Sequence, residues 1–516
     1  MAKNSSDDLF QVIKSLTKSE KRYFKLFVSR LNDSQDKKFV KLFDFLDKQK
    51  IYDEALLLAR EKSIKPAQLS NLKAHLYKQL LQCLKLCNSV QVIDIEIREL
   101  IDYSQILYDK CLYNQCVKTL DKAKKMALKN DRSFILLNIL ELEKLVITKT
   151  IAANNEKRVN KIVAETQMVS NSIKNINTFS NLSLKLNSLY TQIGFIRNKS
   201  DFEKVRKLFH TSIPAVIEEK DLSFHEKLYL YYSFVGYYFF VQDFEKGYNY
   251  AKKWVQLFKE YPDMVIPKLE LYIKGINNLM VAQFKLLKYH EFNETNKKLV
   301  RIRASSGNSD NIQLMLFKYY YVHEINRHFM LGDFKGGVSM IATIENDLEK
   351  FISKLDKHFV LIFYYKIACL YFGNENYKEA LTWLNKIINN KDVDLREDIH
   401  SFSRILSLIS HFELGNTDLV DYYIESTYRF LLNKGNLHQF QKIILIFLKR
   451  LSDEITTENL IKEFAGLKDQ LIPLANNPYE KRAFIYFDII SWLESKIEQR
   501  PVQEIIKEKA MKRLQM

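Results

Sequence analysis

Residues 361–388 read LIFYYKIACLYFGNENYKEALTWLNKII and contain the pattern that decides the fold. An apolar stretch ends in a short polar turn, and an aromatic residue, Tyr377, opens a second stretch that is amphipathic. Ala380, Leu384 and Ile387 follow Tyr377 at offsets of three, seven and ten residues, which fall on one face of a helix. The stretch therefore predicts two helices that pack against each other as a hairpin.

The same polar turn with a following aromatic residue recurs along the chain. Thr417 takes the aromatic position in one turn, and six other turns carry Tyr113, Phe202, Phe244, Tyr289, Phe334 and Tyr377. The gaps between successive turns are 89, 42, 45, 45, 43 and 40 residues. Because the first gap spans about two periods, we expect one degenerate repeat near residues 135–170.

Two further positions of the repeat are also regular. Five residues before the turn aromatic, six of the seven repeats carry a ring, as at Phe372. Three residues after it, most repeats carry a small residue, such as Gly337 or Ala380. Two helices of a hairpin approach most closely near their turn, so a large side chain there would force them apart. Phe292 departs from this rule and predicts a splayed or shifted repeat.

This repeat resembles that of the tetratricopeptide superfamily, most strongly in residues 361–388 and 228–254. In the first stretch, the family's signature columns are filled by Tyr364, Ile367, Ala368, Tyr371, Tyr377, Ala380, Leu384 and Ile387. The resemblance covers roughly residues 95–430. It departs in period, because the family's repeat is about 34 residues long and these repeats are longer. Armadillo and HEAT-type arrays have periods in this range and form the structural alternative.

The composition agrees with a helical array. The chain has 516 residues but only 12 Gly and 7 Pro, the two residues that long helices exclude. No Pro- or Gly-rich linker interrupts it. We therefore predict an all-α fold, a right-handed α-solenoid of stacked antiparallel helical hairpins with an amino-terminal helical module. We expect the module over residues 1–90, the tetratricopeptide-like array over 91–430, and degenerate repeats with capping helices over 431–516.

The amino-terminal module differs from the repeats. Thr17 and Glu20 form a capping-box pattern that opens a helix through about Leu31, and further helices are expected at 36–48, 52–62 and from Pro66 to about Leu86. Residues 1–90 carry 18 of the Lys and Arg residues against 10 Asp and Glu, within a total net charge of +17. Four cations form a basic stripe along the first of these helices: Lys18, Lys21, Arg22 and Lys25. The stripe is either a nucleic-acid contact or an ordinary solvated helix face.

The sequence contains no familiar catalytic or metal-binding motif. No phosphate-binding or dinucleotide-binding glycine loop and no nucleophile elbow is present. His323 and His328 are five residues apart, about 140° around a helix, so they cannot hold one zinc ion together. Cys83 and Cys87 share a helix face, which favours small core side chains over a zinc knuckle. We expect no enzyme activity, no cofactor and no metal.

No uninterrupted apolar window of about 18 residues occurs, and the first residues lack the pattern of a signal peptide. Five cysteines at irregular spacing do not suggest a disulfide framework. These features predict a cytoplasmic protein without a membrane span.

The favoured function is a non-catalytic scaffold or adaptor that binds a protein or peptide on the concave face of the array. The resemblance implies that the first helices of the hairpins line this face. The corresponding columns predict a groove formed by Tyr232, Phe239, Asn277, Phe284, Val322, Phe329, Tyr365, Phe372 and Phe412. Packing between neighbouring repeats is the alternative role for the aromatic column. The alternative function is a nucleic-acid-associated regulator that uses the basic amino-terminal module, with the array as a sensor.

Overall fold

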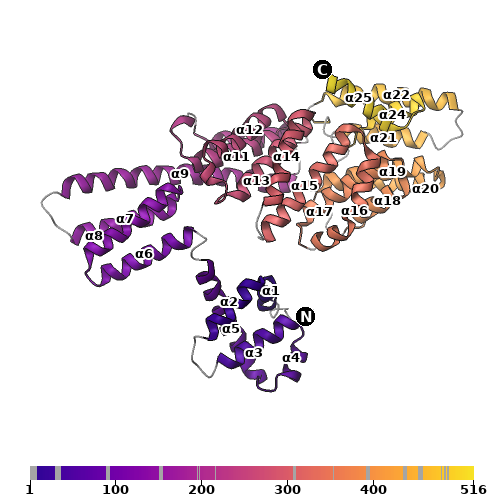
Figure 1. Ribbon diagram of the computed structural model, residues 1–516. Coiled ribbons are helices and arrows are strands. Elements are labelled where there is room, and N and C mark those ends of the chain that lie inside the picture. The colour runs from indigo at the N-terminus through magenta and orange to yellow at the C-terminus, as the bar shows by residue number, and fades with distance from the viewer. Residues whose placement is uncertain are drawn as a thin grey trace. The chain divides into compact units, whose positions relative to one another are not determined.

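The computed structural model describes residues 8–29, 36–88, 93–149, 155–193, 196, 198–214, 217–305, 310–352, 354–390, 396–433, 438–450, 457–477, 479–480, 484 and 487–515. Within these ranges the regular elements are all helices, 24 α-helices and two short 3-10 helices (Figure 1). Helices that follow one another in the chain pack side by side. The predicted all-α, solenoid-like fold is confirmed. None of the described helices is both long enough and apolar enough to cross a lipid bilayer.

The chain divides into two compact units, Met1–Asn171 and Ser172–Met516. The division falls inside the long helix α9 (Asn155–Ile193). The boundaries that the sequence suggests, at residues 90 and 430, stay predictions.

The first unit begins with five helices that share a hydrophobic core of their own. They are α1 (Asp8–Ser15), α2 (Lys18–Ser29), α3 (Asp36–Lys48), α4 (Glu54–Arg60) and α5 (Pro66–Asn88). The predicted capping box is present, because Oγ1 of Thr17 accepts from the Glu20 amide and a Glu20 carboxylate oxygen accepts from the Thr17 amide. Leu31, where we expected α2 to end, lies outside the described residues.

Three further helices of this unit build a second core, to which α9 contributes Ile162. They are α6 (Ile93–Asp109), α7 (Tyr113–Lys129) and α8 (Ser133–Lys149). The α6–α7 pair is the predicted hairpin around Tyr113. The degenerate repeat expected near residues 135–170 falls on α8 and the first part of α9.

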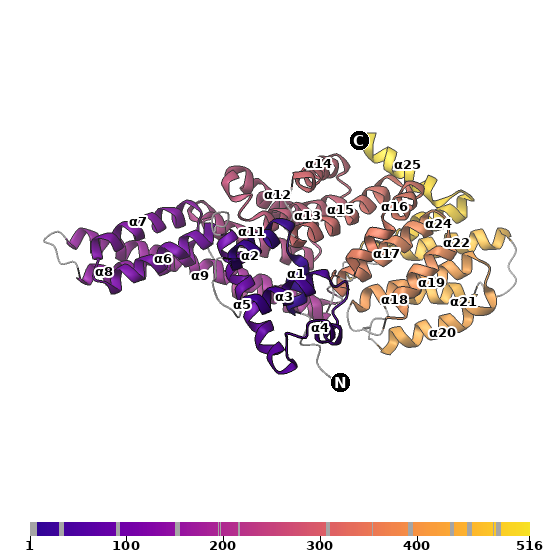
Figure 2. The ribbon, with the colours of Figure 1, turned by 60° about the horizontal axis from the view of Figure 1, so that its bottom comes forward.

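The second unit contains five successive helical hairpins in register with the sequence repeat (Figures 1 and 2). Their first helices are α11 (Phe224–Phe240), α13 (Leu269–Lys285), α15 (Asp310–Leu331), α17 (Lys357–Gly373) and α19 (Glu397–Glu413). Their second helices are α12 (Phe244–Glu260), α14 (Tyr289–Ser305), α16 (Phe334–Ile352), α18 (Tyr377–Ile388) and α20 (Thr417–Asn433). In each hairpin, and in α7, the residue that the sequence aligns at the turn is the first residue of the second helix.

The repeat around Phe202 is shifted. Helix α10 (Lys199–Ser212) begins three residues before the aromatic position, although Val205 and Phe209, three and seven residues after it, are buried as the repeat predicts. The physical reason is a local cap: Oδ1 of Asn198 accepts from the amide of Asp201 at 2.9 Å and starts the helix one turn early.

The small-residue position lies at close helix contacts, but not always with its own hairpin. A Cβ atom on Gly247 would lie 2.5 Å from the ring of Phe239 in the same hairpin, as predicted. One on Gly337 would lie 2.7 Å from a methyl group of Leu370 on α17, in the next hairpin. Ala380 is fully buried. Phe292 is also fully buried and its ring lies 5.8 Å from that of His323 in the next hairpin, so the larger side chain packs forward along the array.

The carboxy-terminal part folds back onto the earlier repeats. It comprises α21 (Gln439–Arg450), α22 (Thr457–Ala475), α24 (Ile489–Glu498) and α25 (Val502–Gln515). Helix α25 contacts α15, and the ring of Phe487 lies 4.9 Å from that of Phe372 on α17. Nε1 of Trp492 donates to a Glu413 carboxylate oxygen at 2.5 Å. This segment therefore covers the turn-side ends of the first helices in the later hairpins.

Candidate binding site on the first helices

The predicted groove residues differ in accessibility. Val322, Tyr365 and Phe372 are 9%, 4% and 0% exposed, so a partner has almost no surface to contact there. The other six are half-buried on the first helices: Tyr232, Phe239, Asn277, Phe284, Phe329 and Phe412. The candidate surface is therefore narrower than the sequence columns suggest.

The aromatic column packs inside the hairpins. The ring of Phe239 lies 5.9 Å from that of Phe244, the first residue of its own second helix. Equivalent pairs join Phe329 to Phe334 at 6.1 Å and Phe372 to Tyr377 at 5.1 Å. The two rings bracket the turn, which explains why an aromatic residue recurs at both positions. This geometry favours the packing role for the column.

A partly buried hydrogen-bond chain crosses three first helices beside these rings. Nζ of Lys366 on α17 donates to Oδ1 of Asn326 on α15 at 2.6 Å. Nδ2 of Asn326 donates to Nδ1 of His323 at 3.4 Å, and Nε2 of His323 donates to Oδ1 of Asn277 on α13 at 3.0 Å. With these orientations of the two asparagine amides, the neutral histidine carries its proton on Nε2. All the bonds run in one direction, from the ammonium group to Asn277.

Both ends of this chain present hydrogen-bond donors. The Lys366 ammonium group lies 5.3 Å from the ring centre of Phe284 and 5.4 Å from that of Phe329. It forms no ion pair with a carboxylate of the described residues. At the other end, the oxygen of the half-buried Asn277 amide accepts from His323, and the NH2 group of the same amide is a donor. The arrangement suits a ligand rich in acceptor oxygens.

Burial sets the charges in the cluster. Burial lowers the pKa of Lys366 to about 8, so the amine is still mostly protonated at neutral pH. Burial, together with the positive charge of Lys366, lowers the pKa of His323 to about 3. His323 is fully buried and stays neutral, so Lys366 is the single cation among the four residues of this hydrogen-bond chain.

Sequence reasoning found Asn277 but missed the other three members. His323 and Lys366 both stand eleven residues before the turn aromatic of their repeats, where Ser233 and Asn278 occupy the preceding repeats. A polar column inside otherwise apolar first helices was the available signal. It says nothing of which members touch, because that depends on the spacing of neighbouring hairpins.

The basic stripe on α2 is partly neutralised by its own unit. Nζ of Lys21 lies 2.6 Å from a carboxylate oxygen of Asp47, and Nζ of Lys25 lies 2.7 Å from one of Asp44. Lys18 and Arg22 are exposed. Because α3 supplies carboxylates to two of the four cations, the stripe offers nucleic-acid phosphates less charge than its sequence suggests.

The residues considered for metal binding do not gather in one place. His323 contacts Asn277, whereas Nδ1 of His328 lies 3.1 Å from a carboxylate oxygen of Asp333. Cys83 is buried, and burial raises the pKa of its thiol to about 11. Among the residues with described positions, no three His, Cys, Asp or Glu side chains form a group that could hold a metal ion.

No family model, no curated protein and no solved structure matches this chain.

Proposed function

We propose that this protein is a non-catalytic scaffold or adaptor whose helical array, of tetratricopeptide type, binds a peptide segment of a protein partner on the first helices. The observation that carries the proposal is the hydrogen-bond chain from Lys366 to Asn277, which presents donors at both ends. A half-buried cation without a carboxylate costs free energy, and a carboxylate of the ligand would offset this cost.

The chemistry of the cluster points to an acidic peptide. A carboxylate beside Lys366 would form a charge-assisted hydrogen bond and raise the lysine pKa back toward its usual range. A peptide carbonyl is the natural acceptor for the Asn277 amide, and an apolar side chain of the peptide can pack on Phe284 or Phe329. No cofactor takes part in this binding.

The partner is to be found by capture with the tagged full-length chain from its native cell. Binding of the captured protein, and of its acidic peptides, is then measured by fluorescence anisotropy with purified components. We expect Lys366→Met to weaken binding on the order of tenfold or more, because a charge-assisted hydrogen bond contributes about 1.5–3 kcal/mol. Denaturant unfolding of the same variant checks its fold, because the substitution also leaves Oδ1 of the buried Asn326 without its donor.

The matched control is Lys274→Met on α13, a half-buried lysine whose Nζ lies 3.1 Å from a Glu270 carboxylate oxygen. It removes the same charge from a neighbouring first helix and should leave the affinity unchanged. Equal affinity of wild type and Lys366→Met would refute the proposed site. Loss of binding in both variants would show a nonspecific charge effect and would also count against it.

The nucleic-acid regulator is the weaker candidate. Its main support is the basic stripe, and two of the four cations of the stripe are engaged by Asp44 and Asp47.

A further inference from the structure

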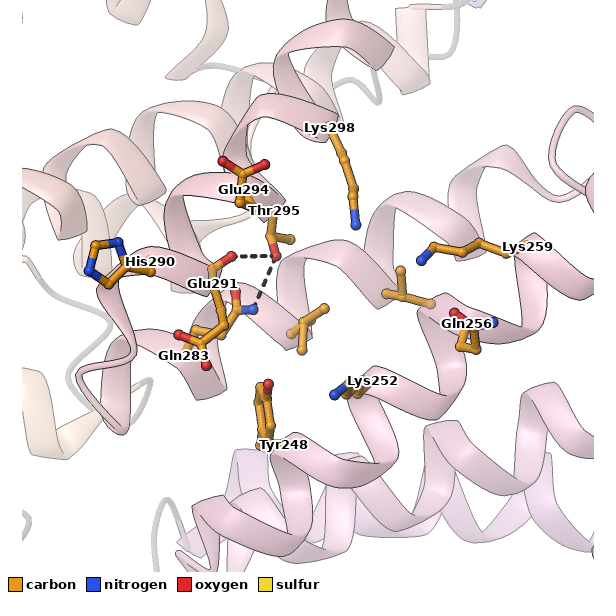
Figure 3. A pocket seen from close by; sticks show the side chains of 12 residues that line it. Tyr248, Lys252, Gln256, Lys259, Gln283, His290, Glu291, Glu294, Thr295 and Lys298 are labelled. Carbon is orange, nitrogen blue, oxygen red and sulfur yellow. Dashed lines mark hydrogen bonds between the residues drawn. The ribbon is translucent and has the colours of Figure 1, made fainter.

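A crevice opens between two second helices, on residues that the proposed peptide site does not use. It lies between α12 and α14, is floored by α13, and has a volume of about 340 Å³ (Figure 3). This volume falls within the usual range of small-molecule sites, about 300–1,000 Å³.

The floor of the crevice consists of apolar side chains and one hydrogen-bonded polar pair. Val255 on α12 and Leu279 on α13 are buried there. Beside them, Nε2 of Gln283 donates to Oγ1 of Thr295 at 3.1 Å, and the Thr295 hydroxyl donates to the backbone oxygen of Glu291 at 2.8 Å. Both side chains are buried, so this polar pair is part of the structure of the floor.

Two ammonium groups, those of Lys259 and Lys298, lie at one end of the crevice, and Lys252 lies across it beside Tyr248. Lys252 and Lys259 extend from α12 and Lys298 from α14, and Figure 3 shows them around the same space. None of the three forms an ion pair with a carboxylate of the described residues. Glu291 lies away from Lys259, whereas Glu294 lies near Lys298 on the same helix and is engaged by Lys297 at 2.6 Å.

We propose that this crevice binds a small, doubly charged organic anion that has an apolar portion. The anionic group would lie between Lys259 and Lys298, and the apolar portion would cover Val255 and Leu279 toward Lys252. The Lys259 and Lys298 cations repel each other, and a dianion removes this repulsion. Burial and the charge of Lys259 lower the pKa of Lys298, and the nearby charge of Glu294 offsets this only in part.

The test uses the full-length chain and isothermal titration calorimetry at constant ionic strength. The probes are phenyl phosphate, phthalate and inorganic phosphate. Phenyl phosphate and phthalate separate a phosphate from a dicarboxylate ligand, and inorganic phosphate reports what the apolar floor contributes. We expect one saturable site for at least one aromatic dianion, with weaker binding of inorganic phosphate.

The variant Lys298→Gln should weaken this binding on the order of tenfold, and Lys259→Gln should act in the same direction. The matched control is Lys297→Gln, the neighbouring lysine that is 59% exposed and paired with Glu294. It should bind like wild type. Absence of saturable binding, or equal weakening by Lys297→Gln and Lys298→Gln, would overturn the proposal. Neither result bears on the Lys366 site, because the two sites share no residue.

Discussion

Lys366 and His323 are two basic side chains within one hydrogen-bond chain, and burial lowers the pKa of both by different amounts. The lysine keeps its charge near neutral pH and the histidine does not. This assignment follows from burial, because a proton on the fully buried imidazole would have to share a low-dielectric space with the ammonium group. A ligand that brings a carboxylate would therefore act on Lys366 and leave His323 neutral.

Stability should fall in acid because of His323. Its pKa is lowered from 6.5 to about 3 in the fold, so between these values the unfolded chain binds a proton that the folded chain does not. The free energy of unfolding therefore decreases as the pH falls through this window, by up to about 1.4 kcal/mol per pH unit for one such group. Urea unfolding at about pH 7 and about pH 4.5 measures the change.

His358, whose pKa burial lowers to about 4, acts in the same direction, so the control must isolate His323. The variant His323→Gln removes one titrating group and keeps an amide in the chain. We expect its stability to depend less steeply on pH than that of wild type. Parallel pH profiles for the two proteins would contradict the assignment of a neutral buried His323.

At the scale of the element, the hairpin turns share one backbone geometry. Two residues before each second helix stands a residue with positive φ: Cys111, Gln242, Leu287, Gly332, Glu375 and Gly415. The amide of the next residue donates back to a carbonyl five residues earlier, as from Asn376 to Tyr371 at 2.9 Å. This is the Schellman ending of a helix, and glycine suits its left-handed residue best. Four of the six turns use another residue and carry strain.

Relief of that strain should stabilise a turn. Glu375 has a φ of 59°, and Glu375→Gly should raise the free energy of unfolding by about 1 kcal/mol. The opposite change, Gly332→Ala, should destabilise the fold, because φ is 64° and a Cβ atom would lie 2.9 Å from the backbone nitrogen of Lys507. Denaturant unfolding of both variants checks the pair. If Glu375→Gly is instead less stable than wild type, the side chain of Glu375 makes contacts that stabilise the turn.

The basic stripe gives an element-scale prediction for the amino-terminal helices. Replacing Lys18, Lys21, Arg22 and Lys25 together with Gln breaks two partly exposed ion pairs, each worth about 0–1 kcal/mol, and keeps the apolar face of α2. We expect the variant to stay folded and to retain the peptide partner. Retention on DNA and RNA columns over a salt gradient measures any nucleic-acid binding. A folded variant that loses its protein partner would place the functional surface on α2.

At the scale of the whole molecule, a helical array responds to damage locally. Each hairpin contacts mainly its neighbours, so its stability depends on its own packing and on adjacent interfaces. The core clusters follow this rule in the first unit, where one cluster lies within α1–α5 and another within α6–α9. The carboxy-terminal segment adds longer-range contacts to α15 and α17.

Ala380→Glu tests this local response. The side chain of Ala380 is fully buried at the α17–α18 crossing, so the variant buries a charge and crowds the contact. We expect a loss of about 3–5 kcal/mol and faster hydrogen exchange in α17 and α18, with α2 and α5 unchanged. Lys378→Glu, which places the same carboxylate at an exposed position of α18, is the control. Uniform loss of protection along the chain would argue against a modular array.

The sequence alone determined where the hairpins turn. Tyr377 and its counterparts mark the first residue of the second helix, because a ring there packs on a ring five residues earlier and both lie within one hairpin. Gly247, at the contact between α11 and α12, follows from the same short-range geometry. Interactions within one repeat are visible to periodicity because the chain itself sets their spacing.

Only the tertiary structure decided which surfaces remain for a partner. Phe372 has the pattern of a groove residue, yet Phe487 covers it from a helix-flanking segment more than a hundred residues later. The Lys366 chain joins three hairpins, and the crevice at Lys298 joins two. These contacts depend on the spacing and rotation between neighbouring hairpins. Those are set by side-chain packing across the interfaces, which no repeat period records.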